Sequence, residues 1–277
     1  MYKVKGKVRL FLRVCCLILS LMLGMVGCEK RNNNSNRDDF GKDEFVAVMG
    51  QPQGVSTNKN SNGKKRVALT FDDGPHNVRT KEIVDELSKY GYNATFFVVG
   101  NRVDGAEYNG ASAVKYAAEK GNEIAIHGYT HSHYYDTCSD TTYKEELKKT
   151  ESAIKSVLPS SSVRLMRPVG GKITDTRVGQ SKYSVIMWSV DSEDWKYKYY
   201  DNTDQSTKRE YLDTIVDNVM SGVEDGSIIL MHDIYLSTYD ATVIILKRLY
   251  EQGYDVVTVS ELLGSDMSAG KKYSRGN

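Results

Sequence analysis

Residues 67–75 read VALTFDDGP, an apolar run that ends in two adjacent aspartates and a Gly-Pro pair. A short apolar run bounded by turn residues is typical of a buried strand, and Gly74 with Pro75 forces a turn directly after it. Two adjacent carboxylates, Asp72 and Asp73, repel each other at a strand end unless a cation binds one of them and leaves the other for a different role. Taken alone, the motif is explained equally well by an ordinary Asp-Gly turn.

Strand-like runs alternate with helix-like segments along the rest of the chain. Gly91, Gly121 and Gly253 follow three helical segments, where a left-handed C-cap favours glycine. The alternation predicts an α/β fold of parallel βα units that close into a barrel, with an open doubly wound sheet as the alternative. The barrel is favoured because no glycine-rich phosphate loop follows the first strand and polar motifs recur at several strand ends. The predicted strands are residues 67–71, 94–99, 123–126, 163–166, 185–190, 227–231 and 254–257, and the predicted helices are 80–90, 112–120, 143–158, 208–223 and 241–252.

A second polar motif, HGYTH at residues 127–131, follows the third predicted strand. Its two histidines are four residues apart, which predicts one face of a helical turn where their nitrogens can converge on one metal ion. Because the chain has only 5 histidines, this spacing favours a ligand pair over two surface histidines, and His133 is a poorer partner for His127. Asp73 with His127 and His131 would supply one oxygen and two nitrogens and leave a position open for water, the pattern of catalytic zinc.

Three more polar groups end predicted strands: RPVGG at residues 167–171, DSEDW at 191–195 and LMHD at 230–233. Each has a plain structural explanation, respectively a surface arginine, an N-cap aspartate and a buried histidine. In their order along the chain, however, the five motifs resemble those of the NodB-homology polysaccharide deacetylases, also called carbohydrate esterase family four. The resemblance covers residues 65–263 and implies a distorted (β/α) barrel, often of seven strands, with the site at the C-terminal ends of the strands.

The resemblance also implies a role for each polar residue on the metal side of the site. It implies that Asp73, His127 and His131 bind a divalent metal, usually Zn²⁺, with Co²⁺ or Ni²⁺ as alternatives. The metal polarises a water molecule and the acetyl carbonyl. Asp72 is then the general base that takes a proton from this water, and Arg167 pairs with the base and keeps it ionised and oriented.

On the leaving-group side, the resemblance implies that His232 is the general acid and that Asp194 orients it and favours its charged form. Trp195 and Leu230 would form an apolar wall around the acetyl methyl group. Gly170 stands where the family motif has an aromatic residue whose backbone N–H donates to the oxyanion. The N–H survives in this chain, so the departure affects the groove wall and the substrate preference rather than the oxyanion donor.

The first 28 residues are predicted to be a lipoprotein signal peptide. Five basic residues stand among the first 13, and an apolar run over residues 10–26 ends at Gly27-Cys28. A basic start, a short apolar run and small residues are typical of a secretion signal rather than a membrane span. The sequence MVGC at residues 25–28 resembles the lipobox of bacterial lipoproteins, so Cys28 is predicted to carry the lipid. An uncleaved N-terminal anchor is the alternative, and both place the domain outside the cytoplasm.

Residues 29–63 are polar and are predicted to form a flexible tether, because such stretches bury too little apolar surface to offset ordering. Residues 64–265 are the predicted catalytic domain, and residues 266–277 are predicted to form a loose polar tail.

The net charge of +1 argues against a nucleic-acid partner, and without residues 1–28 the chain carries 32 basic and 36 acidic side chains. Only Cys138 lies beyond the signal, so no internal disulfide is expected. The expected partners are an acetylated polysaccharide and the bacterial membrane, and we expect a monomer.

Together these features predict a hydrolase that removes N-acetyl groups from N-acetylglucosamine in a cell-wall polysaccharide. Peptidoglycan is preferred over chitin, because the predicted lipid anchor places the domain beside it. An O-acetyl esterase that acts on xylan or a similar glycan stays open because of Gly170. An alternative of a different class is a non-catalytic, glycan-binding surface lipoprotein, which is disfavoured because no metal ligand and no base is lost.

Overall fold

The computed structural model describes residues 63–106 and 109–276. The predicted signal peptide, Cys28 and the predicted tether up to residue 62 lie outside the described residues. Within the described part, no helix is long and apolar enough to cross a membrane.

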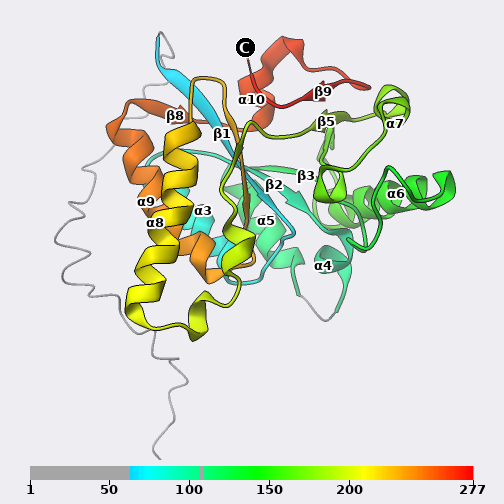
Figure 1. Ribbon diagram of the computed structural model, residues 1–277. Helices are drawn as coiled ribbons and strands as arrows, with labels where there is room; N and C mark the ends of the chain where they lie inside the picture. Colours follow the sequence, from blue (N-terminus) through cyan, green and yellow to red (C-terminus); the bar gives the residue numbers. More distant parts are fainter. Residues whose placement is uncertain (1–62, 107–108, 277) are drawn as a thin grey trace, which may run out of the picture. The chain divides into compact units, whose positions relative to one another are not determined.

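A sheet of parallel strands forms the centre of the molecule (Figure 1). Its strands lie in the order β6-β7-β1-β2-β3-β4-β5-β9, and β8 pairs with the first residues of β1. Every strand pair is parallel, as βα units require. The prediction of a distorted barrel of parallel strands is thereby confirmed. The strands are β1 Lys65–Asp72, β2 Thr95–Val98, β3 Glu123–Ile126, β4 Leu165–Met166, β5 Ser184–Ile186, β6 Val190–Asp191, β7 Ile228–His232, β8 Tyr254–Val256 and β9 Lys272–Tyr273.

The predicted strand over residues 185–190 is wrong as a single element. It is two strands, β5 and β6, which pair with different neighbours: β5 with β4 and β9, and β6 with β7. The guanidinium of Arg167 donates to the carbonyl oxygens of Ile186 and Met187 at 3.1 and 3.0 Å. These carbonyl groups are acceptors that a continuous strand would offer to a neighbouring strand, so the ladder is interrupted there.

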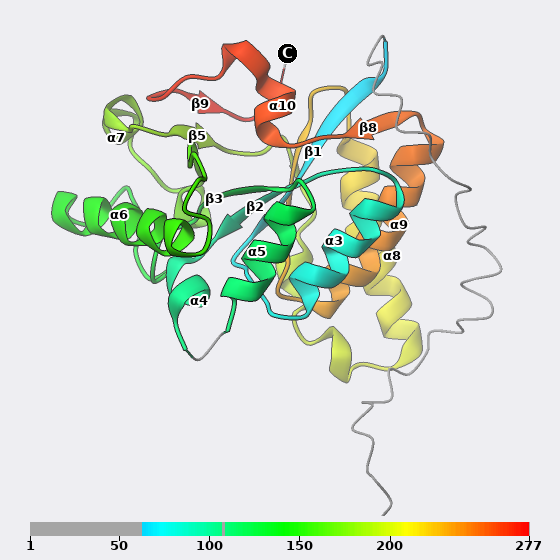
Figure 2. The same cartoon turned by 180° about the vertical axis from the view of Figure 1, so that it is seen from behind.

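The five predicted helices are confirmed, each with slightly different bounds. All five begin earlier than predicted, and in two of them a polar residue caps the new start: Ser139 accepts from the Thr142 N–H, and Asp204 accepts from the N–H groups of Ser206 and Thr207. Helix α8 packs on α9, α9 on α3, and α3 on α5, on the outside of the sheet (Figure 2). The helices are α3 Arg79–Lys89, α4 Gly100–Asp104, α5 Ala111–Glu119, α6 Asp140–Val157, α7 Asp175–Gln180, α8 Gln205–Gly222, α9 Leu236–Glu251 and α10 Val259–Leu263.

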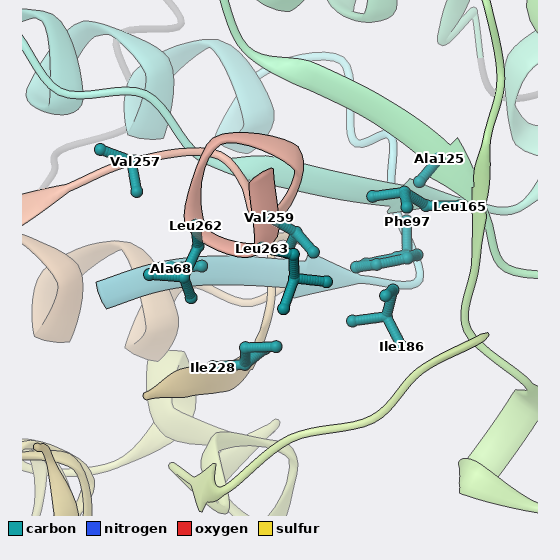
Figure 3. Packing of buried hydrophobic residues seen from close by; sticks show 10 residues of the cluster. All are labelled: Ala68, Phe97, Ala125, Leu165, Ile186, Ile228, Val257, Val259, Leu262 and Leu263. Carbon is teal, nitrogen blue, oxygen red and sulfur yellow. The ribbon is translucent and has the colours of Figure 1, made fainter. Parts of the chain in front are cut away.

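The inside of the curled sheet is apolar at the end opposite the polar motifs. Helix α10 packs on β1 there, and a capping box between Thr258 and Glu261 starts the helix. Burying each large aliphatic side chain contributes about 1.5–3 kcal/mol, so this helix stabilises the barrel as well as covering it. The buried cluster of Figure 3 consists of Ala68, Phe97, Ala125, Leu165, Ile186, Ile228, Val257, Val259, Leu262 and Leu263.

The expectation of a loose tail after residue 265 is wrong. Strand β9 pairs with β5, and Met187 donates its N–H to the Tyr273 carbonyl at 2.7 Å. Arg275 forms an antiparallel bridge with Ser227, just before β7. Polar side chains do not prevent this pairing, because the unpaired backbone groups at the edge of β5 need partners whatever the side chains are. The segment after residue 265 therefore contacts the edge of β5 through β9 and the start of β7 through Arg275.

Candidate active site

The five polar motifs lie at the C-terminal ends of neighbouring strands. Asp72 ends β1 and His232 ends β7, and the two residues are register partners across these strands. His127 follows β3, Arg167 follows β4, and Asp194 begins the 3₁₀ turn η2 (Asp194–Tyr197) after β6. Because the C-terminal ends of parallel strands meet at one face of a barrel, residues more than a hundred positions apart come together.

Three side chains converge on one point beside β1. Oδ1 of Asp73 lies 2.9 Å from Nε2 of His131 and 3.4 Å from Nε2 of His127. This oxygen is buried, yet it receives no hydrogen bond of acceptable geometry. Burial opposes the charge of Asp73, but the two histidines hold the pKa of its carboxyl well below the usual range. A charged oxygen and two nitrogens, all within 4.8 Å of one another, fit a divalent cation of the zinc type.

The backbone of Arg167 sets the orientation of His127. Nδ1 of the buried imidazole lies 2.9 Å from the Arg167 carbonyl oxygen, so an N–H at Nδ1 donates to it and leaves Nε2 free as a ligand. Burial opposes a charge on His127, but Asp72 and Asp73 raise its pKa overall. The electrostatic environment at this ring therefore favours a positive charge.

The side chain of Arg167 is 0% exposed and reaches the neighbouring carboxylate. Nη1 donates to Oδ1 of Asp72 and to Oγ1 of Thr70, both at 2.8 Å, and the guanidinium lies over the Phe97 ring at 4.3 Å. Burial lowers the pKa of Arg167, against the opposing effect of Asp72, but an arginine stays protonated. The arrangement keeps a cation beside Asp72 and fixes the orientation of that carboxylate.

A second charged pair lies at the end of β7. Oδ1 of Asp194 is 2.7 Å from Nδ1 of His232, and its Oδ2 accepts from the His232 backbone N–H and from Oγ1 of Thr238 at 2.8 and 2.5 Å. Burial opposes a charge on His232, but Asp194 outweighs it and raises the pKa of the imidazole to about 10. Asp194 therefore favours the protonated form of His232 and leaves its Nε2 available to a ligand.

Comparison with known proteins assigns this arrangement to a family. The polysaccharide deacetylase family model matches residues 59–184. The peptidoglycan-N-acetylglucosamine deacetylase of Bacillus cereus is 33% identical over 225 residues, which cover 77% of this chain and 95% of that protein. The chain belongs to the polysaccharide deacetylase family. The match to the Bacillus cereus protein extends the likeness well beyond the segment that the family model matches.

Other members of the polysaccharide deacetylase family are similar in sequence and structure. The peptidoglycan-N-acetylmuramic acid deacetylase PdaC of Bacillus subtilis is 37% identical over 234 residues, or 84% of this chain. The chain spans less than half, 44%, of the length of PdaC. The solved PdaC structure superposes with a TM-score of 0.62, covering 72% of this chain and 90% of that one. A family 4 acetyl xylan esterase from Clostridium thermocellum, solved with a cobalt ion, gives a TM-score of 0.65 at 28% identity, covering 76% of this chain and 98% of that one.

The three residues predicted to contact the substrate differ in how far they are exposed and in their backbone conformation. Leu230 is 5% exposed within β7, whereas Trp195 is 49% exposed in η2. Gly170 lies in the short turn η1 (Val169–Gly171) with φ 59°, a left-handed conformation that favours glycine. The predicted apolar wall thus consists of one buried side chain and one exposed ring.

The prediction of a helical turn between the two histidines is wrong. Gly128 and His131 have φ of 85° and 58°, so residues 127–131 form an irregular loop. Glu146 of α6 holds this loop: its carboxylate accepts from the N–H groups of Tyr129 and Thr130 at 2.7 and 2.9 Å and from the Thr130 hydroxyl at 2.9 Å. Sequence analysis missed Glu146, and the available signal was an acidic residue on the buried face of α6.

Asp233 is a second residue that sequence analysis missed, although it is the last residue of the LMHD motif. It is fully buried and accepts a short hydrogen bond from Thr80 Oγ1. Burial raises the pKa of its carboxyl to about 7. A Cβ on Gly74 would overlap this carboxylate, so the turn after Asp73 needs glycine for a steric reason.

Proposed function

We propose that this protein is a metal-dependent hydrolase that removes N-acetyl groups from N-acetylglucosamine residues of peptidoglycan. The observation that carries the proposal is the pairing of a carboxylate with a buried arginine and of a histidine with a buried aspartate, around one candidate metal centre. Amide hydrolysis needs both a base for water and an acid for the leaving amine. The names of the Bacillus relatives support peptidoglycan as the substrate.

The candidate ligands of the metal are Asp73, His127 and His131. A divalent metal, with Zn²⁺ as the first choice and Co²⁺ or Ni²⁺ as alternatives, supplies Lewis acidity toward the acetyl carbonyl and a water molecule. The ligand set of two nitrogens and one oxygen supports zinc. The cobalt ion in the related acetyl xylan esterase supports a divalent metal in general.

Asp72 takes a proton from the attacking water, and Arg167 keeps this carboxylate charged and directed. The backbone N–H of Gly170 donates to the oxyanion that forms on the acetyl carbonyl. His232 then gives its proton to the departing amine, and Asp194 stabilises the protonated ring before the transfer. Trp195 and Leu230 enclose the acetyl methyl group.

We also propose that the chain is exported and held at the outer face of the bacterial membrane by a lipid on Cys28. Residues 29–63 would then allow the catalytic domain to reach the cell wall. A Cys28→Ser protein should be found unprocessed or in the medium rather than in the membrane at its mature size. Recovery of the variant in the membrane at the mature size would refute the lipid anchor.

The decisive experiment measures acetate release by the full-length protein from peptidoglycan, an N-acetylated chito-oligosaccharide and O-acetylated xylan. Activity on the first two substrates should disappear with a chelator and return with Zn²⁺. His127→Ala should lose bound zinc and activity together, because it removes a ligand. Acetate from xylan alone would assign an esterase. No acetate from any substrate by the metal-loaded protein would favour a non-catalytic binding protein.

A further inference from the structure

Two aromatic rings occupy the space beside Gly170 and Gly171. Both glycines have left-handed backbones, with φ of 59° and 70°. A Cβ on Gly170 would lie 3.2 Å from Cε1 of Tyr134, and one on Gly171 would lie 2.9 Å from Cη2 of Trp188. Contacts this short are rare for a real side chain, so the two glycines leave room for rings that come from two other segments of the chain.

The two rings differ in what they contact. Trp188 is partly buried, and the guanidinium of Arg167 lies 5.6 Å from its ring centroid, so it packs behind the charged pair. Tyr134 is 48% exposed. An aromatic side chain exposed to this degree beside a candidate active site is available to a ligand.

Tyr134 lies in the same loop as the candidate metal ligand His131. It follows His131 by three residues in the loop between β3 and α6. The next residue, Tyr135, is buried, donates its N–H to the Lys172 carbonyl at 3.0 Å and forms a bridge with Ile173. The loop that carries His131 is therefore joined to the loop that carries Gly170, and Tyr134 lies at this junction.

An exposed cation lies over the same ring. Nζ of Lys172 is 4.3 Å from the Tyr134 ring centroid, within the range of a cation–π contact. Among residues 63–106 and 109–276, no carboxylate lies within ion-pair distance of Lys172. The ammonium group is therefore held beside the ring and remains available to an anion.

We propose that Tyr134 and Lys172 form a sugar-binding subsite beside the metal ligands. The Tyr134 ring packs on the face of a pyranose, and the Lys172 ammonium group pairs with a carboxylate that the sugar carries. The inference rests on the proposed function and names its substrate more closely: a glycan of N-acetylated amino sugars in which a sugar bears an acidic substituent. A muramic acid residue without its stem peptide is a sugar of this class.

The test compares two tetrasaccharides of equal length, one a neutral N-acetylglucosamine tetramer and one a peptide-free peptidoglycan fragment with carboxylates. KM and kcat are measured for the full-length, metal-loaded protein and for Tyr134→Ala, Tyr134→Phe and Lys172→Gln. Tyr134→Ala should raise KM roughly two- to tenfold on both glycans, since it removes a ring contact, and Tyr134→Phe should keep the wild-type KM. Lys172→Gln should raise KM about two- to fivefold on the acidic glycan only, and added salt should reduce this difference.

Two matched variants control for the loss of a tyrosine or a lysine as such. Tyr250 is 44% exposed on α9, and Lys120 lies 5.6 Å from the Tyr116 ring after α5. Tyr250→Ala and Lys120→Gln should leave KM unchanged on both glycans. A KM of Tyr134→Ala equal to that of Tyr250→Ala would overturn the stacking contact, and an equal effect of Lys172→Gln on both glycans would overturn the charge pairing.

Calorimetric titration of the same two glycans separates this proposal from the proposed function. If the metal-loaded protein binds the glycans but releases no acetate, the proposed function fails while the Kd values of the variants still test the subsite. If acetate is released and neither variant changes KM or Kd relative to the controls, the subsite is wrong and the proposed function stands.

Discussion

The two charged pairs of the site are built differently. In the first pair, the side chains of Arg167 and Asp72 are 0% and 4% exposed. In the second, Asp194 is fully buried, but the side chain of His232 keeps 13% exposure. An arginine holds its proton at every physiological pH, whereas a histidine gains and loses its own. The arginine of the first pair therefore keeps its charge, and the histidine of the second can deliver a proton to a ligand.

The two pairs also differ in the hydrogen bonds that position them. Arg167 directs its donors to Asp72 and Thr70 on β1 and to the backbone at the end of β5, so that its position depends on two strands of the sheet. Asp194 instead accepts hydrogen bonds from β7 and from the start of α9, and it leaves the imidazole at the C-terminal end of β7. Burial of both partners suits a residue that orients a base, and burial of one partner suits a proton donor.

The largest expected effect belongs to the first pair. Asp72→Asn should reduce kcat by about 10²–10⁴-fold on an amide and on an activated ester alike, because both reactions need the base. The bound metal should remain, since Asp73, His127 and His131 are intact. Steady-state rates on both substrates, with metal content measured on the same preparations, check this. Full activity of the variant with its metal bound would remove Asp72 from the role of base.

For the second pair, His232→Ala should cost about 10²–10⁴-fold on the amide and much less on an activated ester. The reason is that the leaving group of an activated ester departs without protonation, whereas an amine does not. The measurement is the ratio of kcat/KM on the two substrates for wild type and variant. Equal losses on both substrates would contradict a general acid at His232 and would make the two pairs equivalent.

A third prediction concerns the pH dependence of the second pair. Asp194 raises the pKa of His232 to about 10, and the protonated ring is the active form, so activity should fall as the pH rises through that pKa. Asp194→Asn removes the charge that favours protonation, and the alkaline limb of kcat/KM should move toward lower pH. Asp175→Asn is the matched control, because the Asp175 side chain is 92% exposed and pairs with Lys272 rather than with a histidine. An alkaline limb that stays in place in Asp194→Asn would refute the pairing.

The smallest expected effect is structural. Thr238→Val removes the hydroxyl that donates to Asp194 Oδ2, and the free energy of unfolding should fall by about 0.5–1.5 kcal/mol. Thr214→Val is the control, because its hydroxyl donates to the Glu210 carbonyl at the surface of α8 and its loss should change stability by less than about 0.5 kcal/mol. Urea unfolding of both variants gives the comparison. A Thr238 variant as stable as the control would show that Thr238 adds nothing to the second pair.

Much of the candidate site was predictable because its residues stand directly after apolar strands. Asp72, Asp73, His127, Arg167 and His232 all follow such runs, and parallel strands bring their C-terminal ends together. The order of the motifs then identified the family. Thr238 and Tyr134 were not predictable in this way, because each acts through a contact with a residue distant in sequence that no local pattern marks. Glu146 carried one local signal, its place on the buried face of α6, but its contact with the loop that carries His131 lies in the tertiary structure.

By itself, the sequence determined the alternation of strands and helices, the family and the residues of the candidate site, because apolar periodicity and short motifs are local properties. Only the tertiary structure decided that residues 185–190 form two strands rather than one, and that the polar segment after residue 265 pairs with β5. In both cases the outcome depends on backbone hydrogen bonds between distant segments: Arg167 occupies carbonyl groups in the first, and the open edge of a strand needs a partner in the second.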